Sequence, residues 1–272
     1  MATLSESVFG EVHPSAVTDL IDRWIYVFTA GLFLAAVLVG FIPESIAKIE
    51  AVQAGLRPPF PVILHVHAVL MGSYLLLLMT QTTLMATNRR ALHKQLGIIS
   101  FGLAPALIVV GFLLIPTMRH QAADTILHGA PAAAERAKRV FDLTLNIMLG
   151  QIKIGVLFAV LTALGLWARR RDSSLHKRLM ILGAAAPLPA AIDRIDWLLP
   201  STLPGSPLTM DLWPLMLLAP MFFWDLYRLG RVHKAYWLYL GLSLALAVPV
   251  HLLWNTPLWR TTALRILGLS GI

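Results

Sequence analysis

Residues 61–87 read PVILHVHAVLMGSYLLLLMTQTTLMAT, a stretch of 27 residues without a single Asp, Glu, Lys or Arg. A helix needs about 20 consecutive apolar residues to cross the hydrocarbon core of a bilayer, which is about 30 Å thick. The rest of the chain has a similar composition, because 57% of its 272 residues are hydrophobic and only 13% are charged. An ordinary soluble domain carries about a quarter charged residues. The sequence therefore argues against a soluble enzyme and predicts an all-α membrane protein.

Six further segments are long and apolar enough to be predicted as membrane-spanning helices, which makes a polytopic bundle of seven transmembrane helices. The sixth span is short and carries Pro214 and Pro220, so we expect it to be kinked or tilted. The seven predicted spans are Trp24–Ile42, Pro61–Thr87, Leu96–Met118, Val140–Ala168, Leu175–Leu199, Asp211–Tyr227 and Ala235–Asn255.

These spans leave no tail or loop long enough to hold a separate soluble core. We expect a single transmembrane domain over residues 1–272, with the lipid bilayer as its surroundings. Within it, 1–23 is predicted to be an N-terminal interfacial segment, 24–259 the seven-helix bundle and 260–272 a C-terminal tail.

Lys and Arg are concentrated in three short connections, after the second, fourth and sixth predicted spans. Short basic loops resist translocation and stay in the cytoplasm, which places the N-terminus in the cytoplasm as well. The long connection 119–139 then lies outside, although it contains Arg136, Lys138 and Arg139. The net charge of +8 is assigned to these loops, and no nucleic-acid partner is predicted.

Any metal site in this chain depends on nitrogen and oxygen ligands, because the sequence has no cysteine. One short pattern occurs three times, as ALHKQLGI at His93, SLHKRLMI at His176 and RVHKAYWL at His233. Each copy begins a helix that runs outward, so the three imidazoles share one depth near the cytoplasmic surface. Imidazole is a common metal ligand, and the three are candidate ligands of iron, copper or zinc. The alternative is that they anchor helix ends among lipid headgroups.

A second set of histidines lies near the outer ends of the predicted spans. His65 and His67 point about 200° apart on one helix, so they cannot chelate one metal together, and each is a separate candidate ligand. His67 belongs to a stripe of polar groups at helical spacing, so we expect it to face the bundle. His251 lies at a similar depth, which makes a His67–His251 pair across a haem one candidate arrangement, with His120 as a substitute for either. The alternative is a buried histidine with a structural hydrogen bond.

Several polar side chains inside the fourth and fifth predicted spans would be costly in contact with lipid, so they should face protein or water. Those of the fourth helix share one face and predict a pocket for a quinone, a proton or a substrate. The alternative is an ion pair between Lys153 and a carboxylate of the fifth helix, which fixes how the two helices pack. The members of this predicted buried polar pocket are Asp142, Asn146, Lys153, Asp193, Arg194 and Asp196.

The order of residues over 65–120 resembles the core of the transmembrane dihaem cytochromes b, the cytochrome b561 and ferric-reductase type. In that family a His followed four residues later by Met begins one core helix, a basic turn ending in His begins the next, and another His closes it. A later His begins a further core helix. The residues in those places here are His67 with Met71, His93 after Arg89 and Arg90, then His120 and His176.

This resemblance implies b-type haem held by axial histidines. The chain departs from the family in its fourth predicted helix, which has Asn146, Met148 and Gln151 but no His where a ligand is expected. The whole chain also resembles a broad family of uncharacterised bacterial multi-pass membrane proteins, marked by Leu-His-Lys/Arg-x-Leu-Gly after one helix and His-Lys/Arg-Arg-x-Met two helices later. The second resemblance implies the bacterial inner (plasma) membrane and no particular activity.

The leading hypothesis is a membrane-embedded redox protein that binds haem b through histidines and transfers electrons within the membrane, with a quinone or another small electron carrier as partner. A second hypothesis is an intramembrane non-haem metalloenzyme with a His-rich site. A third is a transporter or assembly subunit without a redox cofactor. The candidate haem ligands are His67, His93, His120, His176, His233 and His251.

Overall fold

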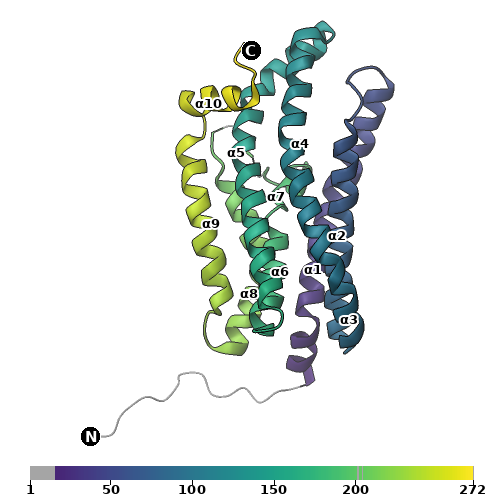
Figure 1. Ribbon diagram of the computed structural model, residues 1–272, viewed down its shortest axis with the longest axis vertical. Helices are drawn as coiled ribbons and strands as arrows, with labels where there is room; N and C mark the ends of the chain where they lie inside the picture. The colour runs from purple at the N-terminus through teal and green to yellow at the C-terminus, as the bar shows by residue number, and fades with distance from the viewer. Residues whose placement is uncertain (1–15, 201, 204, 272) are drawn as a thin grey trace, which may run out of the picture.

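The computed structural model describes residues 16–200, 202–203 and 205–271, and within these ranges the secondary structure is helical, without a strand. Long helices lie side by side in one bundle (Figure 1). The elements are α1 (Ala16–Gln53), α2 (Val62–Ala86), α3 (Arg90–Leu96), a 3-10 turn (Gly97–Ile99), α4 (Ser100–His128), α5 (Pro131–Ala168), α6 (Ser173–Ala185), α7 (Pro189–Ile192), α8 (Leu208–Leu229), α9 (Lys234–Leu253) and α10 (Pro257–Leu267).

Five helical segments of the described chain are long and apolar enough to cross a membrane, which indicates a membrane-embedded protein. In the third of them, α3, the 3-10 turn and α4 follow one another directly, so that the helical path begins at Arg90. The five segments are Ala16–Gln53, Val62–Ala86, Arg90–His128, Pro131–Ala168 and Lys234–Leu253.

The fifth and sixth predicted spans are not among these five. The region predicted as one helix over 175–199 is interrupted, because α6 ends at Ala185 and only the four-residue α7 follows it. Pro187 and Pro189 explain the interruption, since proline lacks an N–H and its ring clashes with the preceding turn. The sixth predicted span lies within α8. This helix is not among the five apolar segments, and it contains two Asp and one Arg.

The prediction that residues 119–139 form a long loop is wrong, because most of them are helical. α4 continues to His128 and α5 begins at Pro131, so that only two residues connect them. Alanine-rich sequence on both sides of this connection favours helix, and Pro131 stands at the start of α5, where its missing N–H costs nothing.

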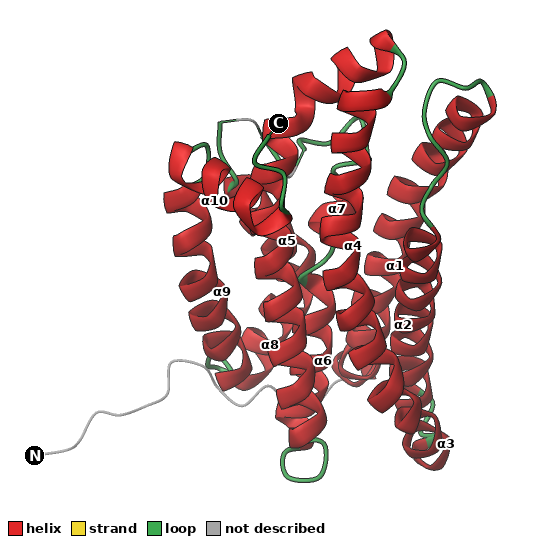
Figure 2. Cartoon of the chain, turned by 45° about the horizontal axis from the view of Figure 1, so that its top comes forward, coloured by secondary structure: helices red, strands yellow, loops and turns green. Residues whose placement is uncertain are grey.

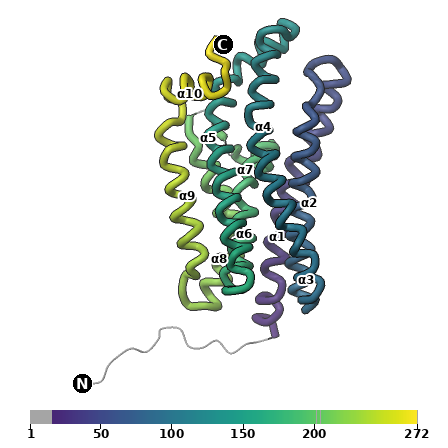
Figure 3. The backbone as a smooth tube through the Cα atoms, viewed as in Figure 1, coloured from purple at the N-terminus to yellow at the C-terminus, as the bar shows by residue number. Residues whose placement is uncertain are grey.

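The boundaries predicted at the two ends of the chain also change. Residues 16–23 of the predicted interfacial segment continue directly into the first span as part of α1, while 1–15 lie outside the described residues. The predicted tail is helical as far as Leu267, because α10 begins at Pro257 with Thr256 as its N-cap. α10 lies across one end of the bundle, against α4 and α5 (Figure 3). We call this the α10 end and the opposite one the α3 end.

α5 and α6 form the centre of the bundle and pack along each other. Leu161 of α5 and Leu179 and Leu182 of α6 are fully buried. The other helices surround this pair, and their outward side chains are largely apolar and exposed, as expected for a surface in contact with lipid. Polar side chains within the bundle must therefore find partners in protein.

The closest approach between α1 and α7 depends on Gly40, because a methyl group at this position would overlap the backbone carbonyl of Ala191. We predict that Gly40→Ala lowers the stability in detergent by about 1–3 kcal/mol, since two backbones would have to separate. The measurement is the midpoint of SDS-induced unfolding in mixed micelles. Gly31→Ala is the matched control on α1, because its methyl group would meet only the end of Met79 at 3.9 Å. Equal effects of the two substitutions would contradict the prediction.

Candidate functional site

The imidazole rings of His93 and His176 lie next to each other at the α3 end. Their centroids are 6.4 Å apart and their planes are inclined by 74°. Each is the fourth residue of its helix, α3 or α6, so both project from a first helical turn. Asp172 fixes the start of α6, because its carboxylate accepts a hydrogen bond from the Leu175 backbone N–H at 2.9 Å. The structure thus brings together two histidines of the repeated pattern.

The hydrogen bonds of this pair leave nitrogen atoms for a ligand. His176 Nδ1 lies 2.8 Å from the Gly165 carbonyl oxygen, which can only accept, so Nδ1 carries the proton and Nε2 the lone pair. Among the described residues, His93 Nδ1 and both polar side-chain atoms of Gln81 are buried without a hydrogen-bond partner. The main chain of Gln81 lies beside the His93 ring. Burying unpartnered polar atoms costs free energy, so these donors form the candidate ligand site.

His233 belongs to the same sequence pattern but has a different role. It is the N-cap of α9, and its Nδ1 accepts a hydrogen bond from the Ala235 backbone N–H at 3.1 Å. Nε2 faces the Ser174 hydroxyl at 3.4 Å. Burial, and then the charge of Arg178, lowers the pKa of His233, which keeps Nδ1 able to accept. The structure therefore changes the predicted three-histidine site into a pair and a helix cap, because His233 precedes its helix whereas the other two lie within theirs.

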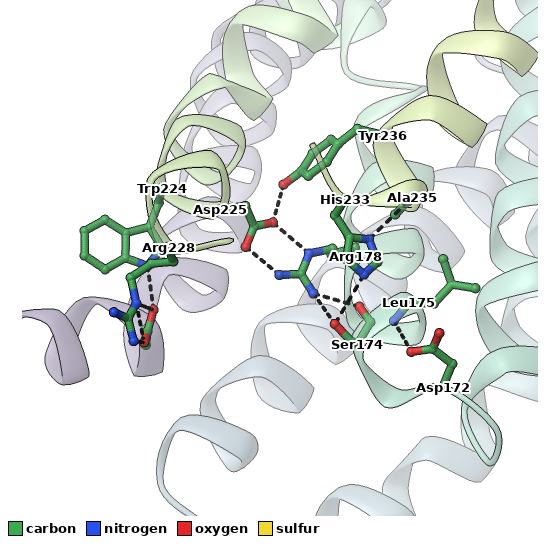
Figure 4. A network of polar contacts seen from close by, with 11 residues as sticks. Asp172, Ser174, Leu175, Arg178, Trp224, Asp225, Arg228, His233, Ala235 and Tyr236 are labelled. Carbon is green, nitrogen blue, oxygen red and sulfur yellow. Dashed lines mark hydrogen bonds and ion pairs between the residues drawn. The ribbon is translucent and has the colours of Figure 1, made fainter. Parts of the chain in front are cut away.

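A buried polar network holds α6 against α8 and α9 at the α3 end (Figure 4). Arg178 donates to both oxygens of Asp225, from Nε at 2.7 Å and from Nη2 at 2.6 Å. Tyr236 Oη donates to the same carboxylate at 2.5 Å. A second ion pair joins Arg228 of α8 to Asp22 of α1 at 2.8 Å. The network was not predicted as a site, although charged residues within apolar helices signal that partners are required.

Lys153, Asp211 and His251 form a row across three helices, nearer the α10 end. Asp211, in the first turn of α8, contacts Lys153 of α5 with one oxygen and His251 Nε2 of α9 with the other, the latter at 2.8 Å. Side-chain exposure rises along the row from 7% through 21% to 35%. The partner of Lys153 is thus on α8 and not on the predicted fifth helix. Asp211 was missed as a partner because it is separated from Lys153 by two helices in sequence.

Other members of the predicted polar pocket have partners of their own. Asp142 accepts a hydrogen bond from Arg260 Nε of α10 at 2.9 Å. Asn146 and Asn255 exchange hydrogen bonds, one of them from the Asn255 backbone N–H to Asn146 Oδ1 at 3.1 Å. The end of α9 and α10 thus meet this face of α5, where Asn146 is buried and Asp142 stays exposed.

The predicted pocket members from the fifth span lie elsewhere. Asp193 accepts hydrogen bonds from the backbone N–H and the hydroxyl of Thr202, both at 2.9 Å. Arg194 pairs with Glu44 of α1 at 2.5 Å, and Asp196 is exposed. The helix break after α6 turns this segment toward α1, so the single predicted pocket is replaced by separate pairs.

The outer histidines do not form the predicted His67–His251 pair, because α2 and α9 lie at opposite edges of the bundle in two views (Figures 1 and 2). His67 packs against Gly111 of α4, with a buried Nδ1 that lacks a partner among the described residues. His120 Nε2 donates to the Leu267 carbonyl at 2.8 Å. His65 is exposed and makes an edge contact with Phe60. Within the described ranges, no group of three or more His, Asp or Glu side chains is arranged to hold a metal ion.

Comparisons of the chain with known protein families, with curated proteins and with solved structures find no match.

The Arg178–Asp225 pair generates a prediction about stability, since the two residues are only 3% and 5% exposed. Asp225→Leu leaves a buried guanidinium unpaired, and we expect it to cost about 3–5 kcal/mol. The double variant Arg178→Met/Asp225→Leu should recover much of this loss, because no uncompensated charge remains. Unfolding midpoints in mixed micelles measure both.

Glu135→Leu is the control for this prediction, because it removes one partner of an exposed ion pair and should change stability by less than about 1 kcal/mol. A double variant that is as unstable as Asp225→Leu would show that something other than the unpaired charge destabilises the protein.

Proposed function

We propose that the protein is a membrane-embedded redox protein in which His93 and His176 hold a b-type haem near the α3 end. The observation that supports this is the 6.4 Å separation of the two ring centroids. Two imidazoles on opposite sides of one metal ion have centroids about 6 Å apart, because a metal–nitrogen bond is about 2 Å and the nitrogen lies about 1 Å from its own ring centre. At this spacing His93 and His176 would be able to hold one iron ion between their rings.

The nitrogen donors of the two histidines also fit a haem iron. The Gly165 carbonyl orients His176 and leaves Nε2 for the metal, which is the usual outer-shell arrangement of a ligating histidine. The orphaned His93 Nδ1 is the matching donor on the other ring. Among the described residues, His93 and His176 are the histidine rings that contact each other, so we propose one haem rather than two.

When bound, haem supplies a one-electron iron couple whose potential depends on its axial ligands and their hydrogen bonds. The chain's own contribution is to hold both rings on separate helices and to exclude water with the apolar bundle. The proposed partner is a quinone or another small electron carrier. The alternative occupant is non-haem iron, copper or zinc, for which the unpartnered Gln81 amide offers a third donor.

We further propose seven membrane crossings, with α6–α7 and α8 added to the five apolar segments, in the bacterial inner membrane and with the N-terminus in the cytoplasm. α6 is enclosed by other helices, and more than half of its residues are buried. Because much of its surface contacts protein and not lipid, α6 can cross the membrane without being apolar on every side. The connections that begin α3, α6 and α9 gather at one end of the bundle (Figure 1). Their Lys and Arg residues favour the cytoplasmic side for this end.

The optical spectrum tests the proposed site. Protein expressed with haem supplementation should show a Soret band that shifts on reduction by dithionite, as expected of bis-histidine haem. His93→Ala and His176→Ala should each abolish the band or reduce it severalfold. His233→Ala is the matched control, because this histidine shares the sequence pattern but caps a helix, and it should retain haem.

Two outcomes would overturn the haem proposal. One is a protein without porphyrin but with stoichiometric iron, copper or zinc by elemental analysis, which would support the non-haem alternative. The other is a loss of haem in His233→Ala equal to that in the two proposed ligand variants.

The row formed by Lys153, Asp211 and His251 favours a second candidate function, which is the movement of protons or ions across the membrane. Three titratable groups from three helices adjoin one another, and their exposure rises toward one end of the row. Ionisable residues inside membrane bundles frequently mark such pathways. This candidate predicts that Lys153→Met lowers potential-driven proton flux into reconstituted vesicles severalfold. Lys138→Met, at an exposed position, is the control, and flux no greater than in empty vesicles would exclude the function.

A further inference from the structure

Two open clefts adjoin each other at the α3 end, between the start of α6 and the turn that joins α8 to α9. Their volumes are about 460 and 290 Å³, and both are lined by Ser174 and Leu229. The larger cleft is also lined by Arg231 and Trp237, and the smaller one by Lys177. Neither cleft includes the His93–His176 pair.

The charges that line the clefts do not balance. Their three carboxylates are all engaged, because Asp172 pairs with Lys234, Asp22 with Arg228, and Asp225 with Arg178. Two cations in the lining are left over. These are Arg231 in the larger cleft and Lys177 in the smaller one.

Neither of these two cations has a carboxylate within ion-pair distance in the described part of the chain. Lys177 instead lies 4.6 Å from the centre of the Tyr26 ring. His233, which also lines the larger cleft, is taken as neutral. Each cleft therefore carries one surplus positive charge, which favours binding of an anion over binding of a cation.

An apolar track leads from the larger cleft along α9. Trp237 forms part of the cleft wall and is 62% exposed. Leu240, Leu244 and Val248 follow it at helical spacing with exposures of 37%, 56% and 55%. From Trp237 to Val248 the helix rises about 16 Å, at about 1.5 Å per residue. This is about half the thickness of a bilayer core, and hence the depth of one leaflet.

We propose that the larger cleft binds the phosphate of an anionic phospholipid through Arg231, that Lys177 in the adjoining cleft adds the second positive charge, and that an acyl chain lies along the α9 track. Basic pockets between membrane helices bind anionic headgroups in this way. The surplus positive charge would repel the ammonium group of a zwitterionic headgroup. A soluble phosphate would make no contact with the apolar track. We therefore propose that the phosphate group belongs to a lipid.

The test measures retention of added phosphatidylglycerol by the full-length protein in detergent, using native mass spectrometry. Wild-type protein should retain phosphatidylglycerol in clear preference to phosphatidylcholine. Each cation near a membrane surface contributes about 1 kcal/mol to anionic lipid binding, so Arg231→Gln should weaken retention about fivefold and Arg231→Gln/Lys177→Gln about twenty-five-fold. Arg136→Gln, an exposed position on α5 near the opposite end, is the charge-matched control and should retain the lipid.

The thermal melting of each variant without added lipid checks that it is folded. If Arg231→Gln melts early, Lys177→Gln alone is measured in its place and should weaken retention about fivefold. Equal retention of the two lipids would overturn the proposal, as would equal losses in Arg136→Gln and Arg231→Gln. If inorganic phosphate raises the wild-type melting temperature as much as phosphatidylglycerol does, and Arg231→Gln abolishes both effects, the site takes a soluble anion and the lipid assignment is wrong.

Discussion

The buried ion pair between Arg178 and Asp225 is the contact on which the α3 end of the bundle depends. Arg178 lies in the first turns of α6, and its partner on α8 also accepts a hydrogen bond from Tyr236 of α9. Three helices are thereby held at one carboxylate that is only 5% exposed, where breaking the pair costs far more than at a surface. The same turns of α6 carry His176, two residues before Arg178, so the network that holds the helix also holds the main chain of His176, whose ring is oriented by the Gly165 carbonyl.

The two ends of the bundle show different chemistry. At the α3 end, polar atoms of His93 and Gln81 are buried without partners in the described chain, which suits a site that an external group completes. Near the α10 end, Lys153, Asp211 and His251 satisfy one another, and the Asn146–Asn255 contact joins α5 to the end of α9. The contact between the His93 and His176 rings is why the proposed redox centre is placed at the α3 end.

The repeated His-Lys pattern shows how position within a helix decides the role of a side chain. His93 and His176 are four residues into their helices, and their rings adjoin across α3 and α6. His233 precedes its helix, and its ring accepts the hydrogen bond of a free backbone N–H. The three copies read alike because in each of them a His is followed by a Lys near the start of a helix. A sequence pattern of a few residues does not distinguish an N-cap from a first turn, since the difference is a shift of one helical turn.

Composition and hydropathy alone determined that this is an all-helical membrane-embedded protein, because lipid accepts backbone only when its hydrogen bonds are made within the segment. The absence of cysteine likewise excluded thiolate ligands from any metal site. Only the tertiary structure decided that His93 meets His176, that Lys153 pairs with Asp211, and that α2 and α9 lie at opposite edges of the bundle. These pairings join residues far apart in the chain. Local hydrophobic periodicity shows which face of a helix turns inward but not which neighbouring helix it meets, since that choice depends on how all the helices pack at once.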